Sequence, residues 1–137
     1  HIHTSFNKED YQVLGSHSFY HYFLQAMRER CNTYEGPESP HIIARLRGVN
    51  RYCRKILSSH KQVGISDKVA GRQQRRTHLN FSWKLHGTIE CRLLPMFHRF
   101  EDAQRWIDAV LDTYEDFLEK EGEKLMDSLK SDLRIVC

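Results

Sequence analysis

The chain opens with alternating polar and apolar residues, which is the period of a β-strand. In HIHTSF, the side chains of His1, His3 and Ser5 fall on one side and those of Ile2 and Thr4 on the other. Because successive side chains of a strand point to opposite faces, this pattern predicts a short strand with two imidazoles on one face. The first residues already look like the inside of a strand, so we expect further protein to precede this chain.

A longer alternating stretch, HLNFSWKLHGTIECRLL at 78–94, predicts two more strands, 78–86 and 88–94, joined near Gly87. Their apolar faces coincide if a three-residue loop, 86–88, connects them. That register places Lys84 opposite Glu90 and Ser82 opposite Arg92. The polar face then becomes one patch of six residues: His78, Asn80, Ser82, Lys84, Glu90 and Arg92.

Helical spacing of apolar residues predicts three helices, at 16–31, at about 40–58 and from 100 to about 129. The last of these should weaken near Gly122. Between the first two, residues 34–40 contain Gly36, Pro37 and Pro40, which indicates a loop. We expect a mobile loop at 60–75, with room for a short strand at 62–65.

These elements together predict an α+β fold. With 137 residues, of which 39% are hydrophobic, the chain has the size of one domain, residues 1–137. No apolar run approaches the roughly 18 residues that cross a bilayer, and no signal-like segment opens the chain. The four cysteines are widely spaced, which favours buried, reduced thiols. We therefore expect a soluble, cytoplasmic protein.

Charge is distributed unevenly along the chain. Residues 41–76 contain ten Lys and Arg against one acid, whereas residues 101–137 contain eleven acids against five bases. The basic stretch predicts an anionic neighbour, and three are open: a nucleic acid, the phosphates of a nucleotide, or the acidic C-terminal helix itself. Tyr52 is the one aromatic residue among these arginines, which is few for a single-strand binder that stacks bases.

Two pairs of residues could carry chemistry. His1 and His3 suit joint contact with a metal ion or a phosphate, although a His-x-His pair near a terminus can also be incidental or part of an affinity tag. Glu90 and Arg92 can present a carboxylate to Mg²⁺ and a guanidinium to phosphate oxygens, or Glu90 can simply pair with Lys84 on a solvated sheet face. No glycine-rich phosphate loop or nucleophile motif is present.

Three segments in order, HIHTS, RLRGVNRYCR and RRTHLNFSWKLHGTIECRLL, resemble the amidoligase family, whose relatives include glutamine synthetase and glutamate–cysteine ligase. The resemblance implies a curved antiparallel sheet with helices packed on its outer side, as in the catalytic domain of glutamine synthetase. It also implies an ATP- and Mg²⁺-dependent ligase, in which ATP phosphorylates a carboxylate and an amine displaces phosphate from the acyl phosphate.

The resemblance also implies roles for individual residues. His1 would bind Mg²⁺ or order a neighbouring ligand, and His3 would touch nucleotide phosphate or substrate. Glu90 would be a metal ligand, and Arg92 would neutralise the transferring γ-phosphate. The same face would be lined by His78, Asn80 and Ser82, with Arg51 and Arg76 as phosphate or carboxylate contacts.

One part of the family pattern is not found in this chain. Family members carry an E-x-E strand before the H-x-H strand, so a preceding segment or a second chain would complete the site. Two alternatives belong to other classes: a structural module that has lost the chemistry, and a nucleic-acid-binding module that uses the basic 41–76 segment.

Overall fold

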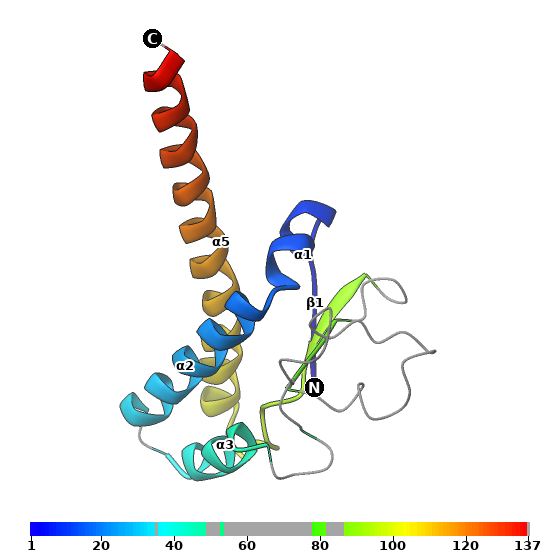
Figure 1. Cartoon of the computed structure of the whole chain (residues 1–137). Coiled ribbons are helices and arrows are strands. Elements are labelled where there is room, and N and C mark those ends of the chain that lie inside the picture. The colour runs from blue at the N-terminus through cyan, green and yellow to red at the C-terminus, as the bar shows by residue number, and fades with distance from the viewer. Residues whose placement is uncertain (35, 49–52, 54–77, 82–86, 137) are drawn as a thin grey trace.

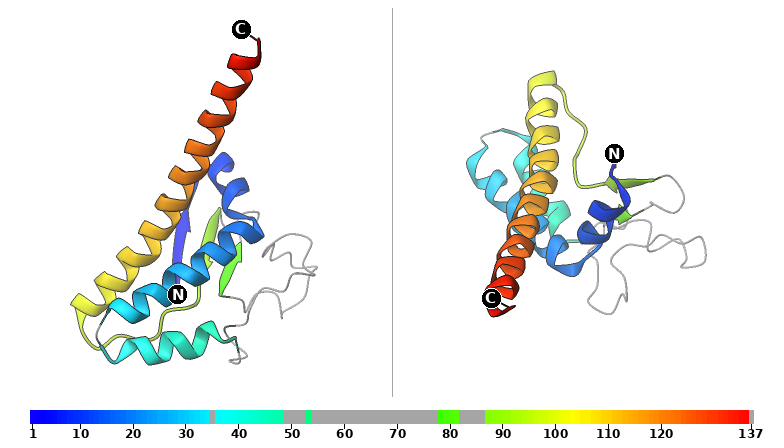
Figure 2. Two further views of the ribbon diagram at one scale, coloured as in Figure 1. Left: turned by 60° about the vertical axis from the view of Figure 1, so that its left-hand side comes forward. Right: turned by 90° about the horizontal axis from the view of Figure 1, so that it is seen from above.

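The computed structural model describes residues 1–34, 36–48, 53, 78–81 and 87–136. Within these residues the chain forms four helices and a three-stranded antiparallel sheet, so the α+β prediction is confirmed at this level. The helices gather on one side of the strands (Figure 1). The last helix extends well beyond the rest of the molecule, which a second view also shows (Figure 2).

Strand β3 (Thr88–Cys91) is the centre of the sheet, between β1 (Ile2–Ser5) and β2 (Leu79–Phe81). The predicted pairing of Lys84 with Glu90 is wrong, because Asn80 is the residue of β2 that pairs with Glu90. The apolar faces of the two strands coincide as predicted, but the register differs by four residues. The chain between the strands is therefore longer than a three-residue loop.

Helices α1 (Lys8–Leu14) and α2 (His17–Thr33) follow β1 directly. Helix α2 agrees with the predicted helix at 16–31, whereas α1, which has only seven residues, was not predicted. Both helices begin at a polar cap: Asn7 Oδ1 accepts a hydrogen bond from Asp10 N at 3.0 Å, and Ser16 Oγ accepts one from Phe19 N at 3.1 Å. Such caps satisfy backbone donors that the first turn leaves unpaired.

Helix α3 (Glu38–Leu46) is shorter than the predicted 40–58. It ends because Gly48 adopts a left-handed backbone conformation, with φ of 72°, which breaks the helical geometry and favours glycine. Apart from Cys53, residues 49–77 lie outside the described part of the chain. The predictions of a loop at 60–75 and a strand at 62–65 therefore lie outside it as well.

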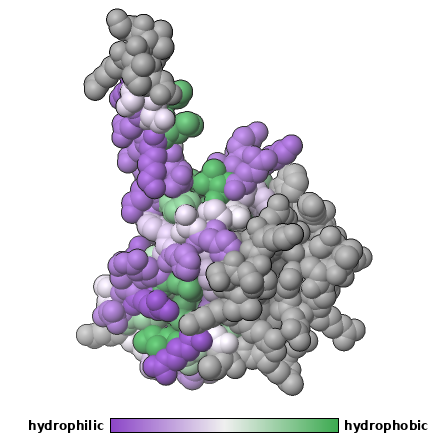
Figure 3. All heavy atoms as spheres, viewed as in Figure 1, coloured by the Kyte–Doolittle hydropathy of each residue, from purple (hydrophilic) through white to green (hydrophobic). Residues whose placement is uncertain are grey.

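Helix α5 (Phe100–Val136) runs without interruption through Gly122, where weakening was predicted. Its first half packs against α2, and the ring centroids of Phe19 and Tyr114 lie 5.5 Å apart. Its second half projects from the molecule and bears exposed apolar side chains among hydrophilic ones (Figure 3): Leu125, Met126 and Leu129.

One core joins the helices to the sheet. The side chains of Leu79, Ile89 and Cys91 are fully buried with those of α2, α3 and α5. Because side chains alternate along a strand, Glu90 lies on the opposite face of β3, away from the helices. Among the described residues no helix is long and apolar enough to cross a membrane.

Candidate functional site

Strand pairing brings two of the predicted site residues directly together. His3 on β1 pairs with Glu90 on β3. On the other side of β3, Asn80 of β2 pairs with the same Glu90. A directly opposite pair on an antiparallel sheet shares a face. The three strands thus set His3, Glu90 and Asn80 in one row.

Glu90 is the centre of a cluster with three cationic or potentially cationic neighbours. Its Oε1 lies 2.9 Å from an Arg92 guanidinium nitrogen and 3.1 Å from His1 Nδ1. Its Oε2 lies 3.9 Å from His3 Nε2, which is longer than a hydrogen bond. We call these four residues, His1, His3, Glu90 and Arg92, the Glu90 cluster.

The Glu90 cluster is sheltered at its centre and open at its edge. The side chains of Glu90 and Arg92 are 10% and 16% exposed, whereas those of His1 and His3 are 47% and 49% exposed. Charges that are removed from water act on one another more strongly than surface pairs do. The cluster can therefore hold a charged ligand at its imidazole edge, next to a fixed carboxylate and guanidinium.

Backbone contacts hold Arg92 in place. Its N–H donates to the carbonyl of His78 at 2.9 Å, and its own carbonyl accepts from Arg45 Nη1 at 3.1 Å. The same Arg45 nitrogen donates to the carbonyl of Leu94 at 2.9 Å. Arg45, one of the basic residues of the 41–76 stretch, is thus half-buried and fastens the chain after β3 to α3.

The prediction that His78 lines the polar face with Glu90 is wrong. His78 is fully buried at the bend before β2, where its ring turns toward the helices. Its Nε2 donates to the carbonyl of Arg45 at 2.6 Å, and its Nδ1 lies 2.9 Å from the hydroxyl of Tyr20. The imidazole satisfies its two nitrogens with these partners, which explains why it enters the core.

The remaining predicted site residues are described in part or not at all. Arg51, Arg76 and Ser82 lie outside the described residues, and so does Lys84. Asn80 is placed by its backbone pairing with Glu90. Sequence reasoning missed Thr88, whose Oγ1 lies 3.1 Å from His3 Nδ1. Thr88 precedes the apolar Ile89 on an alternating strand and so falls on the polar face. That alternation was the available signal.

The Glu90 cluster does not form a complete protein metal site. In the part of the chain that the structure describes, no group of three or more His, Cys, Asp or Glu side chains is placed to hold a metal ion. Mg²⁺, however, takes only one or two carboxylates from a protein when it arrives with a nucleotide, because phosphate oxygens and water fill its other positions. Glu90 fits that requirement. His1 contacts Glu90 instead and so orients the carboxylate.

The described cysteines do not suit nucleophilic chemistry. Cys31, Cys53 and Cys91 are buried free thiols. Burial raises the pKa of Cys53 to about 11 and that of Cys91 to about 12, and it also raises the pKa of Cys31. A thiol attacks as the thiolate, which these shifts make rare at neutral pH.

No protein-family model matches the sequence, and comparisons with curated proteins and with solved structures give no match. The chain is therefore characterised by what its own residues show. It is an α+β protein with a largely buried carboxylate and guanidinium and two half-exposed imidazoles on the face of its sheet away from the helices.

Proposed function

We propose that this chain forms part of the active site of an ATP-dependent carboxylate–amine ligase of the amidoligase type, with a glutamine synthetase-like curved sheet. The observation that carries the proposal is the convergence of His1, His3, Glu90 and Arg92 on one sheet face, within 4 Å of the Glu90 carboxylate. These are the residues that the resemblance assigns to metal and phosphate contacts. They come from segments almost ninety positions apart in sequence.

The chemistry of the cluster suits phosphoryl transfer. This reaction requires positioning and charge neutralisation rather than a protein nucleophile. Arg92, held at its backbone by His78 and Arg45, presents a fixed guanidinium for the oxygens of the γ-phosphate. Glu90 supplies a carboxylate for the Mg²⁺ that accompanies ATP. The buried, high-pKa thiols argue against a covalent route through the described cysteines.

The two half-exposed imidazoles lie at the open edge of the cluster. His1 orients Glu90 through its Nδ1, and His3, held by Thr88, is directed toward the same carboxylate. A ligand that enters from this edge meets His3 before it meets Arg92. We therefore assign His3 to contact with phosphate or substrate. In the proposed reaction a carboxylate attacks the γ-phosphorus, ADP leaves, and an amine then displaces phosphate to give an amide or isopeptide bond.

Calorimetry of Mg²⁺·ATP binding to the full-length protein tests this proposal. We expect saturable binding by the wild type and a loss of about tenfold or more for Arg92→Ala, because a charge-assisted hydrogen bond contributes about 1.5–3 kcal/mol. The control is Arg99→Ala, which removes an arginine whose side chain is 71% exposed and pairs with Glu101 and Asp102, outside the cluster. Glu90→Gln should abolish the dependence on Mg²⁺.

The outcome separates the proposal from its rivals. The expected result is that the wild type binds nucleotide, that Arg92→Ala weakens this binding and that Arg99→Ala does not. This result would justify screening carboxylates and amines for ADP release. A folded wild type that binds no nucleotide would contradict the ligase and favour a structural module. The nucleic-acid alternative is weakened for one of its residues, because the half-buried Arg45 donates to the carbonyls of Arg92 and Leu94.

A further inference from the structure

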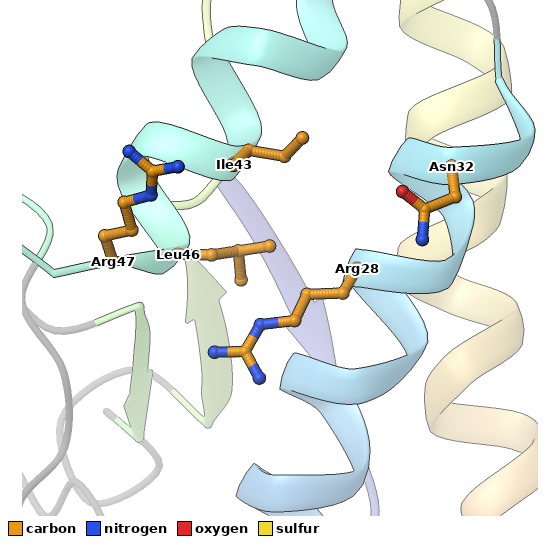
Figure 4. Close-up of a pocket in the computed structure, with 5 residues that line it drawn as sticks. All are labelled: Arg28, Asn32, Ile43, Leu46 and Arg47. Atoms are coloured by element: carbon orange, nitrogen blue, oxygen red, sulfur yellow. The ribbon is translucent and has the colours of Figure 1, made fainter.

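A second candidate binding site lies in the helical layer, apart from the Glu90 cluster. Where the C-terminal half of α2 meets the end of α3, five side chains line an open cavity of about 390 Å³ (Figure 4). Arg28 and Asn32 come from α2, whereas Ile43, Leu46 and Arg47 come from α3 and its C-terminal cap. We call this the α2–α3 groove. Cavities of about 300–1,000 Å³ are typical of sites for small molecules.

The groove is positively charged. Its lining, as far as the structure describes it, contains two arginines and no acidic residue. Arg28 and Arg47 are both exposed, and no ion pair of either guanidinium is found among the described residues. An anion that enters the groove therefore meets two guanidiniums that no carboxylate of the described residues pairs with.

The floor of the groove is apolar. Leu46 is almost fully buried, and Ile43 is half-buried and packs against the core. In Figure 4 both side chains extend between the two helices, with a guanidinium on either helix. Arginine forks bind phosphate and carboxylate oxygens in pairs, and apolar side chains gain from covering a ring or an alkyl chain.

From this arrangement we propose that the α2–α3 groove binds a small organic dianion, whose oxyanion head contacts Arg28 and Arg47 and whose apolar body lies on Ile43 and Leu46. The two arginines match a head of charge −2, which a phosphate monoester or a dicarboxylate supplies. This site is separate from the Glu90 cluster, which lies on the face of the sheet away from the helices. It does not depend on the proposed ligase activity.

Calorimetry with phenyl phosphate and phthalate as probes, at low salt on the full-length protein, tests the proposal and distinguishes the two kinds of head group. We expect saturable binding of at least one probe, tighter than that of inorganic phosphate because the ring covers the apolar floor. Arg28→Ala or Arg47→Ala should weaken it about tenfold, the equivalent of one charge-assisted hydrogen bond. Arg28→Lys should lose less, since it retains the charge.

Controls locate the bound anion. Arg99→Ala should leave the affinity unchanged, and circular dichroism should show that the variants at exposed Arg28 and Arg47 are folded. Arg92→Ala should also leave it unchanged. If Arg92→Ala removes binding and Arg28→Ala does not, the anion occupies the Glu90 cluster and the groove proposal is wrong.

Other results would also overturn the proposal. Equal affinity for phenyl phosphate and inorganic phosphate, unaffected by either groove variant, would show that the groove takes no part in binding. Absence of binding of both probes, together with oligonucleotide binding that requires Arg28 and Arg47, would make the groove part of a polyanion surface instead.

Discussion

The contact between Tyr20 and His78 offers a direct test of how α2 is attached to the sheet. The Tyr20 hydroxyl lies 2.9 Å from His78 Nδ1, and both side chains are buried, with 2% and 0% of their surface exposed. Tyr20→Phe deletes one oxygen and keeps the ring that fills the core. It therefore removes a buried hydrogen bond of an imidazole without opening a large cavity.

The expected loss follows from the burial of the pair. Removing one partner of a buried hydrogen bond costs about 1–3 kcal/mol, because the other partner cannot turn to water. Equilibrium urea unfolding followed by far-UV circular dichroism measures this loss as a lower midpoint with an unchanged slope. In a double-mutant cycle, Tyr20→Phe and His78→Ala should be non-additive by at least about 0.5 kcal/mol.

Tyr22→Phe is a matched control on the same helix. The Tyr22 hydroxyl contacts the exposed Lys120 amine at 3.2 Å, so its removal should cost less than about 0.5 kcal/mol. The ring stays against Phe117, with centroids 5.3 Å apart. If the two tyrosine variants lose equal stability, or if Tyr20→Phe loses less than about 0.5 kcal/mol, the proposed attachment of β2 to α2 through His78 does not hold.

Further predictions concern glycines and thiols. Gly87→Ala should lower the free energy of unfolding by about 1–2 kcal/mol, because the φ of Gly87 is +66°. Gly122→Ala should raise it by up to about 1 kcal/mol, because Gly122 lies in a helix with no atom near the added methyl group. Urea melts in which both variants change stability with the same sign would contradict this. Burial raises the pKa of Cys91 from 9.0 to about 12. The contribution of the buried neutral thiol to the stability of the folded protein is therefore fully present below pH 9 and is lost as the pH rises toward 12. Cys91→Val should flatten that alkaline loss, and iodoacetamide should modify the wild-type residue only after unfolding.

The long helices could be predicted from sequence because each carries a continuous apolar stripe. Phe19, Phe23 and Tyr114, which belong to these stripes, are buried. Helix α1 was missed because seven residues give barely two turns of periodicity. Helix α3 was drawn too long because its apolar spacing continues past Gly48, and only the backbone conformation there shows that the helix ends.

The faces of the strands could be predicted, but their register could not. Alternation establishes that Glu90 and Arg92 share a side, and any even-sum register preserves that result. Selecting one register requires the length of the connection and the contacts at the strand ends. Here, the carbonyl of His78 accepts from Arg92 N, whereas the predicted register placed Ser82 opposite Arg92. The pairing of β1 with β3 is a long-range contact that no local pattern reveals.

The burial of His78 shows a further limit of periodicity. By alternation it belongs to the polar face, since it pairs with Arg92 through the backbone. Two buried partners, the Tyr20 hydroxyl and the Arg45 carbonyl, instead make the core a suitable place for the ring. Neither partner is near it in sequence. A polar residue at a strand end can thus change sides when tertiary contacts satisfy both of its nitrogens.

The burial of the Glu90–Arg92 ion pair bears on the choice between a ligase and a structural module. Both side chains are more than four-fifths buried, at a separation of 2.9 Å. A pair so removed from water gains little stability over apolar side chains of the same volume, since desolvation offsets the attraction. Stability alone therefore gives no reason for charges at this point of the sheet. The proposed phosphate and Mg²⁺ would give one, because a guanidinium binds phosphate oxygens and a carboxylate binds Mg²⁺. Arg45 and His78 hold the end of β3 from the helical side, so the positions of both charges depend on residues that a ligand at the Glu90 cluster would not touch.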